Sequence, residues 1–176
     1  MGTIARGRFI EFVVRDGWEY IRRVRASGVV SIVGTTDENA LVLVEQFRIP
    51  LGCRTIELPS GLVGDVQSSP DEALEQAAIR ELEEETGFRA RHWMPLTSGP
   101  SQSGASSEVV TFFRATGLLR VGTGGGDPTE NITVLVTPLD GIDAVLNEKA
   151  AAGVLVDPKV YAALYFIHSE KHAPRQ

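Results

Sequence analysis

Four glutamates lie within the segment from Arg80 to Phe88, which reads Arg-Glu-Leu-Glu-Glu-Glu-Thr-Gly-Phe. If this segment is helical, Glu81, Glu84 and Glu85 occupy positions i, i+3 and i+4 and share one face. Carboxylates at that spacing repel one another. A hard divalent cation such as Mg²⁺ or Mn²⁺, which prefers oxygen ligands, would remove the repulsion. The spacing therefore favours a metal site, and the alternative is an acidic helix face that is only solvated.

One amphipathic helix must present these carboxylates, and its other face must be buried. Gly87 suits the C-terminal end of that helix. The first turn is expected at Pro70, Asp71 and Glu72, because acidic side chains there meet the positive end of the helix dipole. The apolar stripe expected to pack against a sheet consists of Leu74, Ala77, Ala78 and Leu82.

The same residues resemble the Nudix box, G-x5-E-x7-R-E-U-x-E-E-x-G-U, in which U is a bulky apolar residue. Glu72 matches the first glutamate, and Arg80 to Phe88 matches the remainder at the same spacing. Gly61 best matches the opening glycine, with about five extra residues, Val66 to Pro70, in the loop that follows. Three further segments resemble the ADP-ribose and nucleoside-diphosphate-sugar pyrophosphatase branch of that family: Glu45 to Pro50 (E-Q-F-R-I-P), Glu57 to Gly61 (E-L-P-S-G) and Asp157 to Lys159 (D-P-K).

The resemblance implies an α+β fold, a Nudix-type α/β/α sandwich with a mixed β-sheet and an N-terminal antiparallel β-segment. The order of elements agrees, because strands come first, one helix lies midway and helices come last. We expect one domain of residues 1–176, with the N-terminal β-segment at about 1–40 and the loop-helix-loop of the box at 61–88. The first two expected strands, Arg8 to Val14 and Trp18 to Val24, would form a hairpin around Arg15-Asp16-Gly17. The next two, Val29 to Val33 and Leu41 to Phe47, are a second hairpin candidate. Two further strands are expected at Val109 to Arg114 and Ile132 to Val136. The expected late helices are Gly141 to Ala151 and Pro158 to His168.

The resemblance also assigns metal-binding residues. Glu81 and Glu85 match glutamates that bind the metal directly, and Glu84 matches one that completes the cluster. The carbonyl of Ser60 matches a backbone ligand. Arg80 would hold a neighbouring carboxylate in place, which lysine would do less well.

Glu130 precedes the strand expected at Ile132, where members of the branch carry a loop glutamate. It is a candidate for the base that takes a proton from the attacking water, or for a further metal ligand. The alternative is an idle, exposed acid beside Gly124 to Gly126, a loop that we expect to be flexible and that lacks the setting of a phosphate-binding P-loop. Glu108 is a weaker candidate for the base and is also placed among the residues that bind substrate.

Arg48, Arg54 and Trp18 complete the expected substrate-binding set. Either arginine could bind a phosphate or a terminal ribose through its planar guanidinium, or could be a solvated charge at a strand end. Trp18 could stack on a base, or could lie on a sheet face or at a dimer interface. ADP-ribose-selective members typically carry a proline in a segment like S-P-G-x-S-x-E, whereas Ser103 stands at that position here. Other nucleotide sugars are therefore also candidate substrates.

Composition sets the remaining expectations. The 176 residues carry a net charge of -6, which argues against a general nucleic-acid-binding surface. Cys53 is the only cysteine, so we expect neither a disulfide framework nor a cysteine zinc site. Met1 to Arg8 lacks an apolar signal core and no apolar run approaches a membrane span, so we expect a cytoplasmic protein without a membrane partner. Members of the branch commonly exchange N-terminal contacts between subunits, and we therefore expect a homodimer.

Together these features predict a hydrolase dependent on Mg²⁺, with Mn²⁺ as a possible substitute. It would cleave the pyrophosphate bond of ADP-ribose or a related nucleoside diphosphate sugar into a nucleoside monophosphate and a sugar phosphate. A nucleoside-triphosphate pyrophosphohydrolase is a second enzymatic interpretation, with the same helix and a different pocket. A nucleotide-sensing module without turnover is the third, and the complete set of Glu81, Glu84 and Glu85 counts against it.

Overall fold

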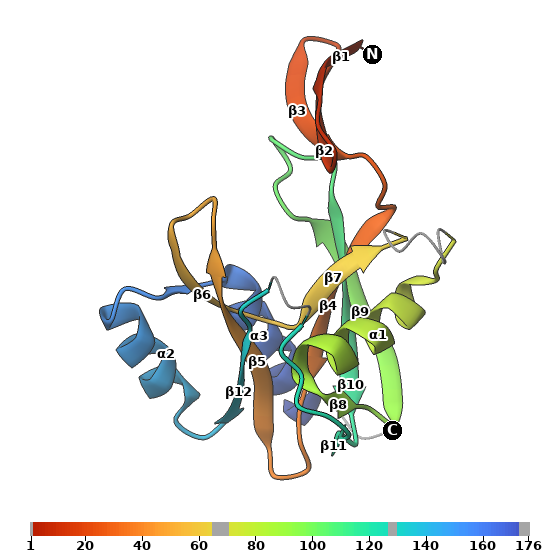
Figure 1. The fold of residues 1–176 in the computed structure, drawn as a ribbon. Coiled ribbons are helices and arrows are strands. Elements are labelled where there is room, and N and C mark those ends of the chain that lie inside the picture. The colour runs from red at the N-terminus through yellow and green to blue at the C-terminus, as the bar shows by residue number, and fades with distance from the viewer. Residues whose placement is uncertain (1, 65–70, 127–129, 173–176) are drawn as a thin grey trace.

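The computed structural model describes residues 2–64, 71–126 and 130–172. Within them the chain forms thirteen strands and three helices, arranged as two four-stranded sheets with helices on either side and a small sheet projecting from one end (Figure 1). The insertion expected at Val66 to Pro70 lies outside the described residues. No helix in the described part of the chain is long and apolar enough to cross a membrane.

The projecting sheet is antiparallel and contains the first three strands (Figure 1). Asp16 and Gly17 turn the chain with φ angles of 52° and 83°, the pair of positive values that a tight two-residue hairpin requires. The sheet meets the body where Ile21 bridges to Ser106. This confirms the predicted first hairpin and the N-terminal antiparallel β-segment. Its strands are β1 (Gly2–Arg6), β2 (Ile10–Arg15) and β3 (Trp18–Arg23).

Both sheets of the body mix parallel and antiparallel pairs. The first has the order β7-β4-β10-β9, in which β10 runs parallel to β4. The second has the order β12-β5-β6-β13, in which β13 runs parallel to β6. The first sheet comprises β4 (Gly28–Gly34), β7 (Ser60–Val63), β9 (His92–Pro100) and β10 (Val109–Thr116), and the second comprises β5 (Ala40–Arg48), β6 (Cys53–Glu57), β12 (Thr133–Pro138) and β13 (Leu155–Val156). Two short strands, β8 (Phe88–Arg89) and β11 (Leu119–Arg120), pair separately.

The second predicted hairpin is wrong, because β4 and β5 belong to different sheets. The turn that joins the two strands contains one isolated β-bridge, between Thr35 and Leu41. Both strands are continuously buried rather than alternating, from Val30 to Gly34 in β4 and from Ala40 to Gln46 in β5. Strands buried on both faces sit inside sheets, so each takes neighbours on both sides from elsewhere in the chain.

Helices cover the two outer sides of the paired sheets, which confirms the predicted α/β/α sandwich (Figure 1). On one side, α1 (Leu74–Thr86) buries Ala77, Ala78 and Leu82 in one core cluster with Val30, Ile32 and Phe113. On the other side, α2 (Ile142–Ala151) and α3 (Pro158–His172) bury Leu146, Val160, Ala163 and Ile167 in a second cluster with Leu43 and Ile56. Burial of these side chains on both sides fixes α1 relative to the strands it faces.

Helix α1 begins later than expected. Ala73 is its N-cap residue and makes no side-chain capping bond, so Asp71 and Glu72 lie before the helix and Glu75 is the acid of the first turn. Pro70 lies outside the described residues. Leu74 is 41% exposed, so the buried stripe starts at Ala77. The predicted end is confirmed, since Gly87 adopts the left-handed conformation and its N–H donates to the carbonyl of Glu83.

Candidate active site

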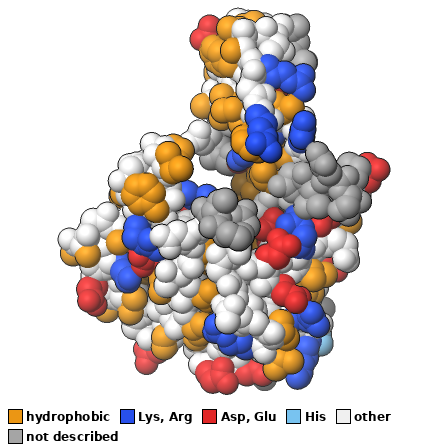
Figure 2. Space-filling view, viewed as in Figure 1, with side chains coloured by type: hydrophobic (Ala, Val, Ile, Leu, Met, Phe, Trp, Pro, Cys, Tyr) orange, Lys and Arg blue, Asp and Glu red, His pale blue; other side chains and the backbone are white. Residues whose placement is uncertain are grey.

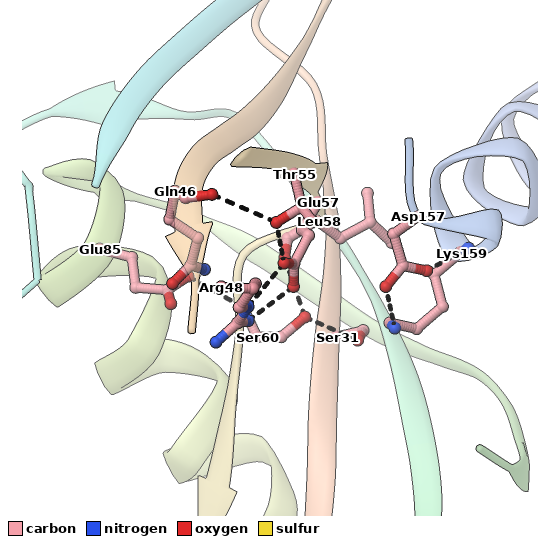
Figure 3. A network of polar contacts seen from close by, with 10 residues as sticks. All are labelled: Ser31, Gln46, Arg48, Thr55, Glu57, Leu58, Ser60, Glu85, Asp157 and Lys159. Atoms are coloured by element: carbon pink, nitrogen blue, oxygen red, sulfur yellow. Dashed lines mark hydrogen bonds and ion pairs between the residues drawn. The ribbon is translucent and has the colours of Figure 1, made fainter. Parts of the chain in front are cut away.

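Glu85 is buried at the last turn of α1, with 5% of its surface exposed. The backbone N–H of Ser60, at the start of β7, donates a 2.9 Å hydrogen bond to its Oε2 (Figure 3). Burial raises the pKa of the Glu85 carboxyl well above its usual value, and the negative charges of Glu81 and Glu130 raise it further. The Ser60 hydrogen bond and the charge of Arg48 oppose this only in part. The site therefore concentrates negative charge in a place with little water.

Glu81 lies against the backbone of β7 at Gly61. A Cβ at position 61 would overlap the Glu81 carboxylate. This contact explains why glycine is needed at the position that the sequence matched to the opening glycine of the box. Helix α1 and strand β7 thus bring Glu81, Glu85 and Ser60 together.

Arg80 ties several carboxylates together. It donates to both oxygens of Glu72 at 3.1 Å, to Glu81 at 2.7 Å and to Glu84 at 3.0 Å. It also donates to the carbonyl of Leu62 in β7 at 3.1 Å. Burial alone would lower the pKa of Arg80, but its hydrogen bonds to Glu72 and Glu81 and the Glu81 charge raise it well above the usual arginine value. Glu72, outside the helix, is therefore held by Arg80 rather than by the helix dipole.

The donor set fits a hard divalent cation in its chemistry. The side chains are all carboxylates, and the pKa of Glu85 is raised first by burial and then by the charges of Glu81 and Glu130, which a cation would offset. As they stand, no three His, Cys, Asp or Glu side chains in the described ranges form a group that could hold an ion. Glu81 and Glu84 turn instead toward the Arg80 guanidinium. An ion at this site would have to compete with Arg80 for them.

Arg48 faces the carboxylate cluster from the end of β5. Its Nε and Nη2 donate to the two oxygens of Glu57 at 2.7 and 2.6 Å, a two-point ion pair drawn in Figure 3. These bonds raise the pKa of Arg48 against the opposing effect of burial, and the charges of Glu85 and Glu130 raise it further. Thr55 also donates a hydrogen bond to Glu57. The Arg48 guanidinium is therefore held in place within electrostatic reach of Glu85.

Arg54 is on the opposite face of the same sheet. The register pairs Arg48 with Cys53 and Phe47 with Arg54, and residues that pair directly point to one face. Arg54 donates to Glu45 at 2.6 Å, and Lys149 of α2 also binds Glu45. These partners, Lys149 first, lower the pKa of Glu45. The structure therefore brings Arg48 to the Glu85 cluster and does not bring Arg54 there.

Glu130 and Glu108 occupy different places. Glu130 is exposed, and its charge acts on both Glu85 and Arg48, so it lies at the cluster. Glu108 forms a 2.8 Å ion pair with Arg23 at the base of the projecting sheet. It lines a cavity of about 650 Å³ whose wall also includes Lys159. Glu108 thus lines this cavity and does not join the carboxylates of α1.

Trp18 begins β3 in the projecting sheet, which lies away from α1 in Figure 1. Its side chain is 68% exposed and lines a shallow groove together with Tyr20, Ser103 and Gly104. Within one chain, Trp18 is therefore not brought to the carboxylate cluster.

The roles of Glu57 and Thr55 were not predicted from the sequence. Together with Gln46 and Arg48 they form a polar patch on one face of β5 and β6, drawn in Figure 3. Burial alone would raise the pKa of Glu57, but the hydrogen bonds from Arg48 and Thr55 bring it below its usual value. The signal was present in the sequence, because charged or polar residues at alternate positions of a buried strand must find partners on one face.

Comparisons with known proteins agree with this geometry. A family model described as NUDIX domain matches residues 22–156. A methanol dehydrogenase activator of Bacillus methanolicus is 30% identical over 149 residues, which cover 84% of this chain and 76% of that protein. An ADP-ribose pyrophosphatase of Bacillus subtilis (strain 168) is 36% identical over 92 residues, 52% of this chain and 47% of that protein. The match thus spans about half the length of that relative.

A solved structure described as an ADP compounds hydrolase superposes with a TM-score of 0.72 and 24% sequence identity. The superposition covers 99% of this chain and 94% of the chain in that structure. At that identity the superposition shows a shared fold, and it includes the projecting N-terminal sheet.

Proposed function

The chain belongs to the Nudix family of hydrolases, and from that premise we propose that it uses Mg²⁺ to hydrolyse the pyrophosphate bond of ADP-ribose or a related nucleoside diphosphate sugar. The products would be a nucleoside monophosphate and a sugar phosphate. One observation carries the proposal: a buried Glu85 carboxylate, bonded to the N–H of Ser60, faces the charges of Glu81 and Glu130. A carboxylate that is buried beside other acidic side chains and has a raised pKa is more typical of a functional site than of a structural helix face.

In this proposal Glu81 and Glu85 would hold the cation, Glu84 would complete the set of ligands and the carbonyl of Ser60 would add a backbone oxygen. Mn²⁺ could replace Mg²⁺ because both prefer oxygen ligands. The bound cation would neutralise phosphate charge and make water more acidic. Arg80 positions the carboxylates through the ion pairs described above.

The remaining groups act on water and substrate. Glu130 would accept the proton of the attacking water, a role suited to an exposed carboxylate at the edge of the cluster. Arg48, fixed by Glu57, would bind a phosphate oxygen through its remaining donors. Glu108 and Lys159 would contact the nucleoside or sugar portion in the 650 Å³ cavity, a volume suited to a small-molecule ligand. Arg54 is already engaged by Glu45, so any contact with substrate would compete with that pair.

We further propose a homodimer formed through the N-terminal β-segment. Six arginines and three acidic residues fall within residues 1–25 of a chain whose net charge is -6, so the sheet is basic and the remainder acidic. Exposed apolar side chains lie on the same projection, among them Ile4 and Trp18 on its strands and Phe9 in the turn between β1 and β2. Figure 2 shows hydrophobic and basic side chains gathered there. A second copy offers the complementary acidic surface. Sedimentation should give twice the mass of one chain, and Phe9→Glu should shift it toward the monomer.

We also propose that residues 1–176 form one functional domain, which acts in the cytoplasm on small molecules rather than on nucleic acid or at a membrane. The lone Cys53 and the acidic balance support that setting.

A substrate panel with Mg²⁺ tests the reaction and separates the alternatives. AMP and ribose phosphate from ADP-ribose would support the proposal, and faster turnover of other nucleotide sugars would agree with Ser103 in place of proline. Inorganic pyrophosphate released from nucleoside triphosphates alone would instead support a triphosphate pyrophosphohydrolase. Binding without turnover across the panel would identify a sensor.

A further inference from the structure

The glycine-rich segment from Gly122 to Gly126 docks on the last turn of α1. Gly125 N–H donates to the carbonyl of Glu85 at 2.8 Å, and Gly126 N–H donates to the carbonyl of Glu84 at 3.0 Å. The carbonyl of Gly87 in turn accepts from Gly122 N–H at 3.1 Å. The sequence suggested a flexible loop here, whereas these bonds satisfy helix-end carbonyls that α1 cannot satisfy itself.

Close backbone approach makes the docking specific to glycine. At Gly124, where φ is +69°, a Cβ would overlap the backbone of Thr86 and approach the Glu85 carbonyl oxygen at 2.7 Å. At Gly87 a Cβ would overlap the carbonyl of Gly122. The two chain segments therefore pack backbone against backbone at Gly87 and Gly124.

Gly126 extends this contact to Glu130. With φ at +70°, a Cβ at position 126 would overlap the Oε2 atom of Glu130 and meet Ile132 at 2.9 Å. The Glu130 carboxylate thus rests in the space that the missing side chain leaves. One short segment is bonded to the backbone of Glu84 and Glu85 and also determines where the Glu130 carboxylate can lie.

We propose that Gly124 and Gly126 are positioning residues that fix the Glu130 carboxylate relative to Glu85. Gly124 allows the segment to dock on α1, and Gly126 leaves room for the carboxylate. The inference rests on the proposed hydrolysis, because Gly126 acts on the reaction only through Glu130. Helix capping alone would use the N–H groups of Gly125 and Gly126 and would place no demand on the Glu130 side chain.

Four variants test this in the full chain. Gly126→Ala should lower kcat by at least about tenfold with KM changed less than twofold, since general-base catalysis contributes about 10²–10⁴-fold and the base is displaced. Gly153→Ala is the matched control, because Gly153 also has positive φ (+85°) but has nothing within 4 Å of an added Cβ. Its kcat should stay within twofold of wild type. Glu130→Gln and the double variant Gly126→Ala/Glu130→Gln complete a cycle in which the double should turn over at the rate of Glu130→Gln.

Two outcomes of the cycle would overturn the inference. One is a double variant whose loss is the product of the two single losses, because Gly126 would then act independently of Glu130. The other is a Gly126→Ala loss no larger than that of Gly153→Ala.

Two further measurements do not depend on turnover and separate failure of the inference from failure of the proposed function. Amide exchange of Gly125 and Gly126 should be slow in wild type and fast in Gly124→Ala, while Gly153→Ala should leave it slow. The ¹³C signal of the Glu130 carboxyl, identified by its loss in Glu130→Gln, should move in Gly126→Ala and not in Gly153→Ala. Fast exchange in wild type, or an unmoved signal, would overturn the positioning role even if ADP-ribose is hydrolysed.

Discussion

The backbone N–H of Ser60 donates a 2.9 Å hydrogen bond to the buried carboxylate of Glu85, joining the first residue of β7 to the last turn of α1. This bond offsets only part of the cost of burying a carboxylate beside Glu81 and Glu130. The protein therefore keeps a destabilised acid in place, as expected where charge is reserved for a ligand.

Glu85→Gln should lower turnover by more than about 100-fold, beyond the usual loss for a group that only supports a metal ligand. It should also raise stability in EDTA, because the amide removes a buried charge. Since the folded pKa of Glu85 lies above its ordinary value of 4.5, the free energy of unfolding of wild type should fall as pH rises from 4.5 toward the raised pKa. Urea unfolding across that range checks the slope, which should be smaller in Glu85→Gln. Equal slopes would show that Glu85 titrates normally.

Gly61→Ala should displace the Glu81 carboxylate from β7. Because the overlapping atoms are the end of a flexible side chain, the melting temperature should change little while kcat falls at least about tenfold. Gly104→Ala is the control, since an added Cβ there meets nothing within 4 Å. Steady-state kinetics and thermal unfolding of both variants decide the matter. A large loss of stability with normal kcat would mean that Gly61 serves the fold and not the site.

Arg80→Lys should reduce divalent-ion affinity or kcat by about 10–100-fold, because an ammonium cannot bridge Glu72, Glu81 and Glu84 together. Arg89→Lys is a suitable comparison, since Arg89 pairs with Glu83 near the C-terminal end of α1 and both side chains are exposed. Its effect on either quantity should be less than twofold. If the two lysine variants behave alike, Arg80 contributes only charge.

Arg48→Lys should raise KM by about 10–100-fold, with a smaller change in kcat. This rise in KM is the range expected when one or two charge-assisted hydrogen bonds, worth about 1.5–3 kcal/mol, are lost. Lysine cannot keep the two-point pair with Glu57. Arg54→Lys, on the opposite face of the sheet, should leave KM within about threefold. A larger KM effect at Arg54 would place the substrate on the side of α2 instead.

The sequence was sufficient to predict helix α1 and its partners, because amphipathic periodicity and spaced motif residues agreed. Arg80 was expected to hold a carboxylate, and it contacts Glu81 and Glu84. The predicted start of α1 was wrong. Glu72 would suit a first turn, but it lies outside the helix, where it accepts a hydrogen bond from Arg80. Local preference could not reveal that tertiary contact.

Strand pairing was harder to predict. The turn between β4 and β5 suggested a hairpin, but burial on both faces places each strand inside a different sheet. The pairing of Arg48 with Glu57 depends on strand register, which sequence alone leaves open. The docking of Gly125 on Glu85 joins segments about 40 residues apart through backbone atoms, so side-chain patterns give no sign of it.

Binding of Mn²⁺, measured by electron paramagnetic resonance of the free ion, tests the central claim most directly. Titration into wild type should remove at least one equivalent of ion from the free signal, and adding Mg²⁺ should release it. Glu85→Gln should leave the free signal close to that of buffer. Equal binding by wild type and Glu85→Gln, or no binding by either, would contradict the assignment of this carboxylate cluster as the metal site.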